Sequence, residues 1–260
     1  MIKHDVQNQK DTRRIKIDKV GVKNIHYPII VEDRANKIQH TTAIIDIYVE
    51  LPHEYRGTHM SRFLEVLNSY HKETLIDNLE PFLHDIKQKL HSEAAYVNIK
   101  FPYFIKKTAP VSNIESLLDY QCEFSAVLNK SFDFIISVNV PVTTLCPCSK
   151  EISQYGAHNQ RSKVTLKARY KDFIWIEELI AYVEKSASCE IYPLLKRVDE
   201  KYVTEKAYEN PVFVEDIVRD ITLKLKQDKR ITWFSIESEN FESIHNHSAY
   251  AFVEQEQNED

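Results

Sequence analysis

The order of hydrophobic periodicities along the chain constrains its fold more than any other feature. Segments with two-residue alternation, which is typical of strands, enclose segments with helical spacing of their apolar residues. The order strand–strand–helix–helix–strand–strand results, and it occurs twice. Because this pattern is typical of antiparallel sheets with helices on one face, we predict an α+β fold. The expected strands are residues 14–31, 38–51, 95–104, 117–128, 132–142, 162–170, 231–239 and 248–254.

Four helices are expected between these strands, the first, second and fourth marked by an apolar stripe. Thr58 is the expected N-cap of the first, and Pro81 marks a kink or a start in the second. The fourth is expected to open at Asn210, with Pro211 in the first helical position. The stripes comprise Met60, Phe63, Leu64 and Leu67; Ile76, Leu79, Leu83, Ile86 and Leu90; and Val214, Ile217, Val218, Ile221 and Leu225; the third helix is expected over residues 173–188.

The doubled pattern predicts two modules of similar size. Residues 14–129 form the first and residues 130–254 the second, and no sequence identity links them. Both ends of the chain are polar, so we expect a flexible N-terminal tail over residues 1–13 and a solvated tail over residues 255–260.

The charge and the glycine content exclude several classes of function. A net charge of −5 provides no global basic field for nucleic-acid binding. Three glycines are too few for a Walker loop or a dinucleotide fingerprint. The N-terminus has no signal-peptide core, and no apolar run is long enough to span a bilayer. We therefore expect a cytoplasmic protein with reduced thiols and with neither a nucleic-acid nor a membrane partner.

The segment LCPCSKEISQYGAHNQRS, residues 145–162, is the strongest candidate for a site because it ends an apolar strand. A disulfide between Cys146 and Cys148 would be strained. Buried packing thiols, a structural metal clip and a reactive centre remain as interpretations. A thiolate together with the imidazole of His158 suits zinc or a similar divalent ion. Since no second Cys or His pair completes a four-ligand clip, an open site with three protein ligands and water fits better.

Two further clusters add carboxylates and an imidazole. Glu215 lies early in the fourth expected helix, where the helix dipole keeps a carboxylate ionised and able to accept two parallel hydrogen bonds. Glu242 and His245 lie three residues apart in an expected turn, an arrangement that suits proton transfer and equally fits an exposed polar hairpin. Basic residues near these segments could hold phosphates, and they are Lys150, Arg161, Lys163, Arg197 and Lys201.

Three segments of the chain together resemble the prokaryotic type IB GTP cyclohydrolase I family. They read PVTTLCPCSKEISQYGAHNQRS, KRVDEKYVTEKAYENPVFVEDIVRD and NFESIHNHSAY, and they occur in the family's order. The resemblance spans nearly the whole chain after the N-terminal tail. It implies the tunnelling fold, in which ββααββ modules assemble into barrels, with two tandem modules in each chain. It also implies homotetramers whose active sites lie at subunit interfaces.

The resemblance implies roles for five residues at a metal centre. Cys146, His158 and Glu200 match the positions that hold the metal ion in the family. The ion is divalent, and Zn, Mn or Fe suits this set of ligands. Glu242 and His245 match the family's further catalytic residues, beside Cys146 and His158.

The substrate that the resemblance implies is GTP. Glu215 matches the glutamate that anchors guanine, and Arg161 and Lys150 are the basic residues that we expect to bind the triphosphate. The implied reaction converts GTP and water into 7,8-dihydroneopterin triphosphate and formate, the first step of pterin and folate biosynthesis.

Two other functions fit part of the sequence. One is a thiol-dependent enzyme of the same fold, such as a nitrile reductase, with Cys146 or Cys148 as nucleophile and NADPH as hydride donor. The other is a non-catalytic module that binds a metal or a nucleotide, and whose metal contributes to folding.

Overall fold

A computed structural model of the chain describes residues 7, 9–70, 74 and 76–257. The tails expected over residues 1–13 and 255–260 therefore lie partly outside the described residues. The chain divides into two compact units. The first unit comprises Met1–Pro102 and Glu123–Ile135, and the second comprises Tyr103–Cys122 and Ile136–Asp260.

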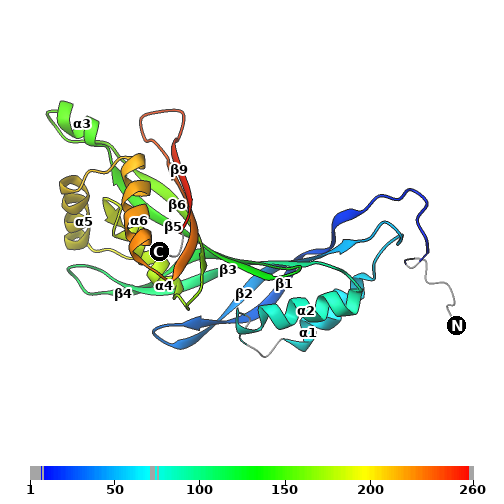
Figure 1. Ribbon diagram of the computed structural model, residues 1–260. Coiled ribbons are helices and arrows are strands. Elements are labelled where there is room, and N and C mark those ends of the chain that lie inside the picture. The colour runs from blue at the N-terminus through cyan, green and yellow to red at the C-terminus, as the bar shows by residue number, and fades with distance from the viewer. Residues whose placement is uncertain (1–6, 8, 71–73, 75, 258–260) are drawn as a thin grey trace. The chain divides into compact units, whose positions relative to one another are not determined.

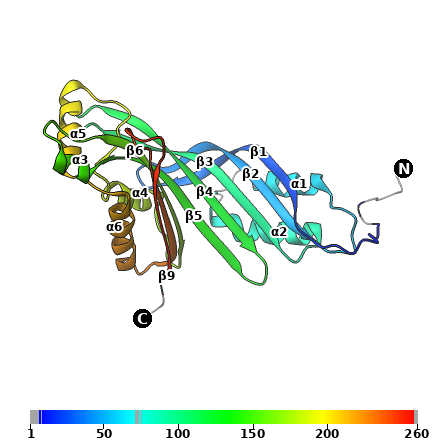
Figure 2. The same cartoon turned by 90° about the horizontal axis from the view of Figure 1, so that it is seen from above.

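The first unit is an antiparallel sheet with two α-helices packed against it (Figures 1 and 2). It contains β1 (Ile17–Asp33), β2 (Lys37–Leu51), α1 (Met60–Ser69), the short 3-10 helix η1 (Ile76–Asn78), α2 (Leu79–Leu90) and parts of β3 (Ala95–Thr108), β4 (Glu115–Leu128) and β5 (Phe132–Leu145). In β2, which pairs with both β1 and β3, alternate residues such as Ile45 and Ile47 are buried. α1 and α2 lie side by side and cover this core with Phe63 and Leu83.

The second unit holds the C-terminal half of the sheet and most of the helices (Figure 1). Its further elements are α3 (Pro147–Ile152), β6 (Asn159–Tyr170), α4 (Ile176–Glu184), β7 (Cys189–Glu190), α5 (Arg197–Glu209), α6 (Val214–Gln227), β8 (Ile231–Asn240) and β9 (Ala249–Glu256). The strand order is β3-β4-β5-β6-β8-β9, and β7 pairs with β5. α6 packs on β8 and β9 through its buried stripe, which includes Ile217, Ile221 and Leu225.

Three helices of the second unit share one capping device. None of their N-cap side chains accepts a hydrogen bond from the first turn. Instead, the carboxylate of the third helical residue accepts a hydrogen bond from the N-cap backbone N–H, which satisfies one exposed donor and places negative charge at the positive end of the dipole. The pairs, from backbone nitrogen to carboxylate oxygen, are Trp175–Glu178 at 3.1 Å, Lys196–Asp199 at 2.8 Å and Phe213–Asp216 at 3.2 Å.

Asp199 has a second task, because it also holds the turn between β3 and β4. Its Oδ1 accepts hydrogen bonds from the backbone nitrogens of Val111 and Ser112, and its Oδ2 accepts one from the Ser112 hydroxyl. Burial opposes ionisation of this carboxyl, but the hydrogen bonds outweigh it and hold the Asp199 pKa below its ordinary range. α5 is therefore anchored to the sheet by one ionised side chain.

The antiparallel α+β architecture and the eight expected strands are confirmed. The second half is more elaborate than the sequence pattern predicted, since it also contains α3, β7 and α5. α5 has no apolar stripe, and only Asp199 and Ala207 are buried in it, so its charged sequence gave no helical signal. The helix expected over residues 173–188 is shorter and spans Ile176–Glu184.

Two predicted helix starts are wrong. α1 has His59 rather than Thr58 at its N-cap, and no side chain caps it. α6 begins at Val214, four residues after Asn210, because the segment between them hydrogen-bonds to the end of β5 instead of starting the helix. The backbone N–H of Val212 donates to the Leu145 carbonyl at the end of β5, at 3.0 Å. In α2, by contrast, Pro81 does mark a helix start, since the helix begins two residues earlier.

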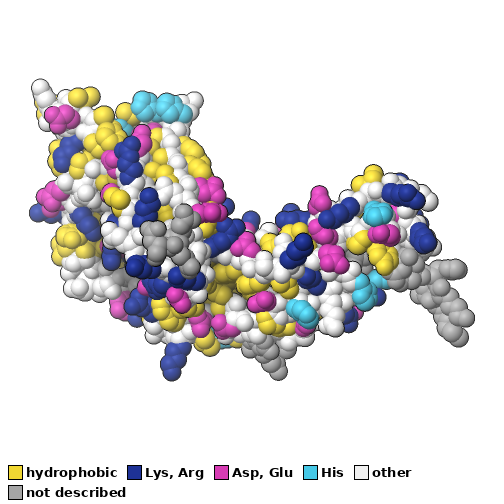
Figure 3. Space-filling model, in the orientation of Figure 1, with side chains coloured by type: hydrophobic (Ala, Val, Ile, Leu, Met, Phe, Trp, Pro, Cys, Tyr) yellow, Lys and Arg dark blue, Asp and Glu magenta, His cyan; other side chains and the backbone are white. Residues whose placement is uncertain are grey.

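Acidic and basic side chains intermix over the face of the molecule that Figure 3 shows. This distribution agrees with the modest net charge of −5. Among the helices in the described part of the chain, none combines the length and the apolar character needed to cross a membrane.

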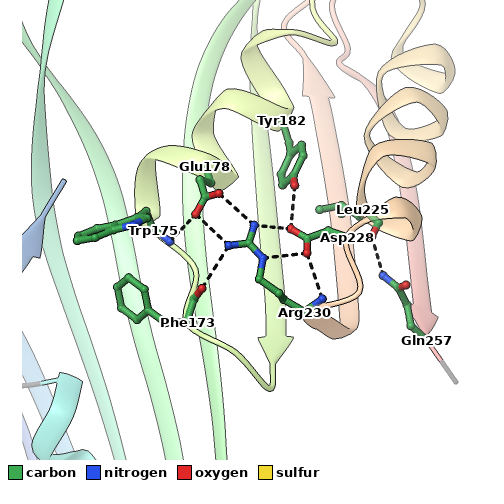
Figure 4. Close-up of polar contacts among 8 residues, drawn as sticks. All are labelled: Phe173, Trp175, Glu178, Tyr182, Leu225, Asp228, Arg230 and Gln257. Carbon is green, nitrogen blue, oxygen red and sulfur yellow. Dashed lines mark hydrogen bonds and ion pairs between the residues drawn. The ribbon is translucent and has the colours of Figure 1, made fainter. Parts of the chain in front are cut away.

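Arg230 joins the start of α4 to the turn between α6 and β8 (Figure 4). Its guanidinium donates to Asp228 Oδ2 at 2.7 Å and to Glu178 Oε1 at 3.0 Å, and Tyr182 Oη donates to the same Asp228 carboxylate at 2.9 Å. The hydrogen bonds from Arg230 lower the pKa of Asp228. Because Glu178 also caps α4, this cluster fixes the position of a helix that packs on α6 and β6.

Replacing Arg230 by methionine should lower the melting temperature at pH 7 by several degrees. A charged hydrogen-bond network of this exposure contributes about 1–2 kcal/mol, and each kcal/mol shifts Tm by roughly 2–4 °C in a chain of this size. The depressed Asp228 pKa stabilises the fold above the ordinary carboxyl pKa of about 4, and this contribution is lost as the pH falls through the depressed value.

The Tm difference between wild type and Arg230→Met should therefore narrow in acid, as followed by circular dichroism across pH. Arg219→Met is the matched control, because Arg219 is an exposed residue that pairs only with Asp216 among the ion pairs of the described chain. Its Tm should change little. Equal shifts for the two variants would contradict a structural role for the Arg230 cluster.

Candidate active site

One pocket of the second unit gathers most of the residues that the sequence singled out. It has a volume of about 290 Å³ and lies where β5, β6, α6, β8 and the loop before β9 meet. Among the residues that the structure describes, its lining comprises Cys146, His158, Gln160, Val212, Phe213, Val214, Glu215, Asn240, Glu242, His245, His247 and Ala249. Five predicted site residues, Cys146, His158, Glu215, Glu242 and His245, therefore share one cavity.

Strand pairing places the thiol and the imidazole side by side. β5 and β6 pair up to the rung Leu145–Asn159, and the Cys146 N–H continues this ladder by donating to the His158 carbonyl at 3.1 Å. Ser149 braces the same rung, because its Oγ donates to the Cys146 carbonyl and accepts from the His158 N–H, at 3.1 and 3.2 Å. The two side chains therefore project from adjacent backbone positions at the end of the sheet.

Pro147 ends the strand and begins α3, which separates the two cysteines of the motif. Cys146 is the N-cap of α3, with an extended backbone, and its Sγ accepts a hydrogen bond from the Ser149 N–H at 3.4 Å. Cys148 is inside the helix, exposed, and outside the pocket lining of the described chain. The two thiols therefore lie in different environments, no disulfide joins them, and all four cysteines are free.

The imidazole of His158 faces two other polar side chains of the pocket lining. Its Nδ1 lies 3.0 Å from Gln160 Oε1 and 3.8 Å from Glu242 Oε2. The His158 and Glu242 side chains are each only 13% exposed, so both are shielded from bulk water. Gln160 itself is buried in β6 and had not been identified from the sequence.

Glu215 enters the pocket from the positive end of α6. It is the second residue of the helix, and Phe213 and Val214 beside it also line the cavity. The hydrogen bond from Val212 N–H to the Leu145 carbonyl fixes this helix start against the end of β5, next to Cys146. The helix dipole favours an ionised carboxylate at this position.

The loop between β8 and β9 closes one side of the pocket and confirms the predicted turn. Figure 3 shows histidine side chains gathered over this loop. The rings of His245 and His247 stack with their centroids 5.0 Å apart, and both residues are exposed. Glu242, at the start of the loop, accepts a hydrogen bond from Gln160 Nε2 at 3.5 Å. This contact connects the loop to β6.

The remaining predicted residues lie outside the lining that the described residues form. Glu200 is exposed on α5, and Arg161 is exposed on β6. The ammonium group of Lys150 donates to the Tyr208 carbonyl and stands 4.5 Å from the centre of the Tyr208 ring. The other basic candidates, Lys163, Arg197 and Lys201, are exposed and also outside the lining.

Three polar lining residues had not been predicted from the sequence: Gln160, Asn240 and His247. Gln160 and Asn240 occupy inward-facing positions of β6 and β8, and the next inward position on each strand is also a buried polar residue, Ser162 or Ser238. Asn240 is 3% exposed, and its Oδ1 has no hydrogen-bond partner among the described residues, so the pocket offers a buried acceptor to a ligand. Two successive polar residues at inward positions of an otherwise apolar alternation were the signal that could have revealed Gln160 and Asn240.

The pocket provides part of the set of ligands that a divalent ion needs. Within the described residues, no group of three or more His, Cys, Asp or Glu side chains is arranged to hold a metal. The pocket does provide a thiol and an imidazole on one rung, with the Nδ1 atom of that imidazole already engaged by Gln160. A soft thiolate and a free imidazole nitrogen are ligands that zinc and similar ions prefer.

Several solved structures share the fold at very low sequence identity. Urate oxidase from Bacillus sp. TB-90 matches with a TM-score of 0.55 and 9% identity, covering 93% of this chain and 100% of that one. A uricase from Bacillus fastidious matches with a TM-score of 0.55 and 7% identity, covering 92% and 93%. These similarities concern the fold alone, an antiparallel sheet with helices.

Comparison with protein families gives a much closer relationship. A family model described as type I GTP cyclohydrolase FolE2 matches residues 4–251. A GTP cyclohydrolase FolE2 of Geotalea uraniireducens is 59% identical over 255 residues, covering 98% of this chain and 94% of the relative. Those of Geobacter metallireducens and Magnetococcus marinus are 58% and 59% identical, covering 97% and 96% of this chain and 97% and 95% of the relatives. The chain therefore belongs to the type I GTP cyclohydrolase FolE2 family, as its three motifs implied.

Proposed function

We propose that this chain converts GTP and water into 7,8-dihydroneopterin triphosphate and formate in the pocket at the end of β5 and β6. It is a GTP cyclohydrolase I by family, and its product enters pterin and folate biosynthesis. The observation that carries the assignment of the site is the single cavity that joins Cys146, His158, Glu215, Glu242 and His245. These residues come from four separate segments of the second unit.

The proposed metal ligands are Cys146, His158 and Glu200, and the ion is Zn, Mn or Fe. The first two lie on one rung of the sheet. Glu200 is proposed on its position in the motif, and its side chain is exposed. A bound divalent ion supplies a Lewis acid that makes water a nucleophile near neutral pH. The family is known as metal-dependent, and the choice among the three metals is part of the proposal.

Glu215 is the proposed anchor for guanine. Guanine presents the N1–H and N2–H donors along one edge, and an ionised carboxylate accepts both, which selects guanine over adenine. Glu215 lies in the N-terminal turn of α6, at the positive end of the helix dipole. Arg161 and Lys150, both close to the motif in sequence, are proposed to bind the triphosphate.

Glu242 and His245 are the proposed proton-transfer pair for opening the imidazole ring and closing the pterin ring. Glu242 is shielded and faces His158, whereas His245 is exposed on the loop over the pocket. A shielded carboxylate and a solvent-accessible imidazole can pass a proton between the substrate and water.

At the level of the assembly, we propose two tandem ββααββ modules of the tunnelling fold, residues 14–129 and 130–254, and a cytoplasmic homotetramer with active sites at subunit interfaces. The ββααββ order of the first half supports the module. At the sheet edge, β9 exposes Tyr250 and Phe252 by 58% and 50%, which suits pairing with another copy.

The two rival functions are not favoured. The family is that of a GTP cyclohydrolase rather than a nitrile reductase or a binding module. A thiol-dependent reductase also has no use for the carboxylates and imidazoles that surround Cys146.

The activity itself is tested by incubating GTP with the protein and Zn²⁺, Mn²⁺ or Fe²⁺ under reducing conditions. We expect formate and, after oxidation and dephosphorylation, a fluorescent pterin in equal amounts, and no product after chelation of the metal. ATP in place of GTP is the control for base recognition. Intact GTP with all three metals would refute the proposed function.

Cys146→Ala should lower turnover by on the order of 100-fold or more, because even outer partners of a metal ligand contribute about 10–100-fold. Cys148→Ala is the matched control and should stay within about threefold of wild type, since Cys148 lies outside the pocket lining. Turnover of GTP at saturating metal is the measurement. Equal losses in the two variants would remove the basis for choosing Cys146.

Glu215→Gln should weaken GTP binding by about 10- to 100-fold, because the neutral amide presents a donor where guanine needs an acceptor and an unmet hydrogen bond costs about 1–3 kcal/mol. Equilibrium dialysis with metal-free protein measures the affinity without turnover. Asp220→Asn removes the same charge from an exposed position of the same helix and should leave the affinity unchanged. Unchanged GTP affinity in Glu215→Gln would exclude the anchoring role.

A further inference from the structure

A row of buried polar side chains crosses the inner face of the sheet behind the pocket. Thr144 on β5 stands opposite Gln160 on β6, and Ser162 on β6 stands opposite Asn240 on β8. Their exposed fractions are 0%, 8%, 1% and 3%. The next inward positions are apolar on β5 and β6, at Val142 and Val164, and on β8 the buried Ser238 precedes the apolar Ile236, so the polar side chains gather at the end of the sheet that bears Cys146.

Hydrogen bonds link this row to the imidazole of His158. The hydroxyls of Ser162 and Thr144 are 2.8 Å apart, and Gln160 Nε2 donates to Thr144 Oγ1 at 3.0 Å. On its other side Gln160 Nε2 faces Glu242 Oε1 at 3.5 Å. Gln160 Oε1 faces His158 Nδ1 at 3.0 Å.

The chemistry of these groups decides which way the amide of Gln160 points. An ionised carboxylate can only accept hydrogen bonds, so the group that faces Glu242 must be the amide nitrogen. The flipped amide would set its oxygen against the Glu242 carboxylate, which places two acceptors together in a site shielded from water. The hydroxyl of Thr144 holds the same orientation from the opposite side.

With the amide fixed, the protonation of the imidazole follows. The Gln160 oxygen is an acceptor, so His158 Nδ1 must carry the hydrogen, and Glu242 Oε2 at 3.8 Å favours the same arrangement. In a neutral imidazole the other nitrogen, Nε2, then keeps its lone pair. A histidine that binds a metal through Nε2 needs this tautomer.

We propose that Gln160 is a positioning residue that locks His158 in the Nδ1–H tautomer and so presents Nε2 to the metal ion. The function of this lock rests on the proposed role of His158 as a ligand. Gln160 acts through His158, and through its amide nitrogen it also orients the Glu242 carboxylate, so one side chain sets both groups.

The tautomer is measured on metal-free protein labelled with ¹⁵N-histidine, at pH 8.5, well above the ordinary histidine pKa of about 6.5. Comparison with a His158→Ala spectrum assigns the signals. Wild type should show His158 protonated at Nδ1. Gln160→Leu removes the acceptor and should shift His158 toward the Nε2–H form. Gln160→Glu keeps an acceptor toward Nδ1 and should retain the wild-type tautomer.

Metal affinity is measured with Co²⁺ alone, from its visible absorption bands. Gln160→Leu should weaken Co²⁺ binding by about 10- to 100-fold, the range found for outer partners of metal-bound histidines. Gln160→Glu keeps the acceptor toward Nδ1 but loses the donor toward Glu242, so its Co²⁺ affinity should lie between those of wild type and Gln160→Leu, an order that a mere packing role for Gln160 does not predict. Gln121→Leu, on the exposed surface of β4, is the control for the substitution and should change neither measurement.

Thr144→Val is the second test, and it decides the matter if Gln160→Leu fails to fold. Valine keeps the shape of threonine but removes the hydroxyl that holds Gln160, so a mixture of His158 tautomers and a smaller loss of Co²⁺ affinity are expected. An unchanged Nδ1–H tautomer in both Gln160→Leu and Thr144→Val would overturn the proposal. If wild type shows the Nδ1–H form but does not bind Co²⁺, the lock stands and the metal role of His158 is refuted instead.

Discussion

The hydrogen bond from the Cys146 N–H to the His158 carbonyl is the contact on which the whole site depends. It adds one rung to the antiparallel ladder, just after the last residue of β5 and just before the first residue of β6. Without it, the thiol and the imidazole would belong to two independent loops. With it, their relative position is set by the fixed spacing of paired residues in an antiparallel ladder. Pro147 is the first residue of α3, so the strand pairing ends directly after Cys146.

The other pocket residues are placed by reference to this rung. Val212 hydrogen-bonds to Leu145, which brings the start of α6 and its Glu215 to the same strand end. Glu242 approaches from the end of β8 and meets the side chains of His158 and Gln160. A strand, a helix terminus and a loop therefore converge on one backbone hydrogen bond, and groups from distant parts of the sequence acquire a common frame. Sites built on such rigid elements hold their geometry better than sites on free loops.

The sequence predicted the fold class and the strands well because both depend on local alternation, which is strong in segments such as β2 and β5. It predicted the residues of the pocket through motifs rather than through geometry. It could not predict α5, whose helix is fixed by the contact of Asp199 with a turn more than eighty residues earlier in the chain. It also missed Gln160, whose importance appears only when β5, β6 and the β8–β9 loop are brought together. Local pattern identifies elements, whereas polar networks between elements are properties of the assembled structure.

The capping of helices by an internal carboxylate has a consequence for how this pocket can evolve. Asp216 accepts the hydrogen bond of the Phe213 N–H from within α6, and the Phe213 side chain itself makes no cap hydrogen bond. Phe213 occupies the N-cap position and forms part of the pocket wall. Substitutions there can reshape the cavity without loosening the helix that carries Glu215. Stability and substrate fit are thereby assigned to neighbouring but separate residues, and selection can act on one without disturbing the other.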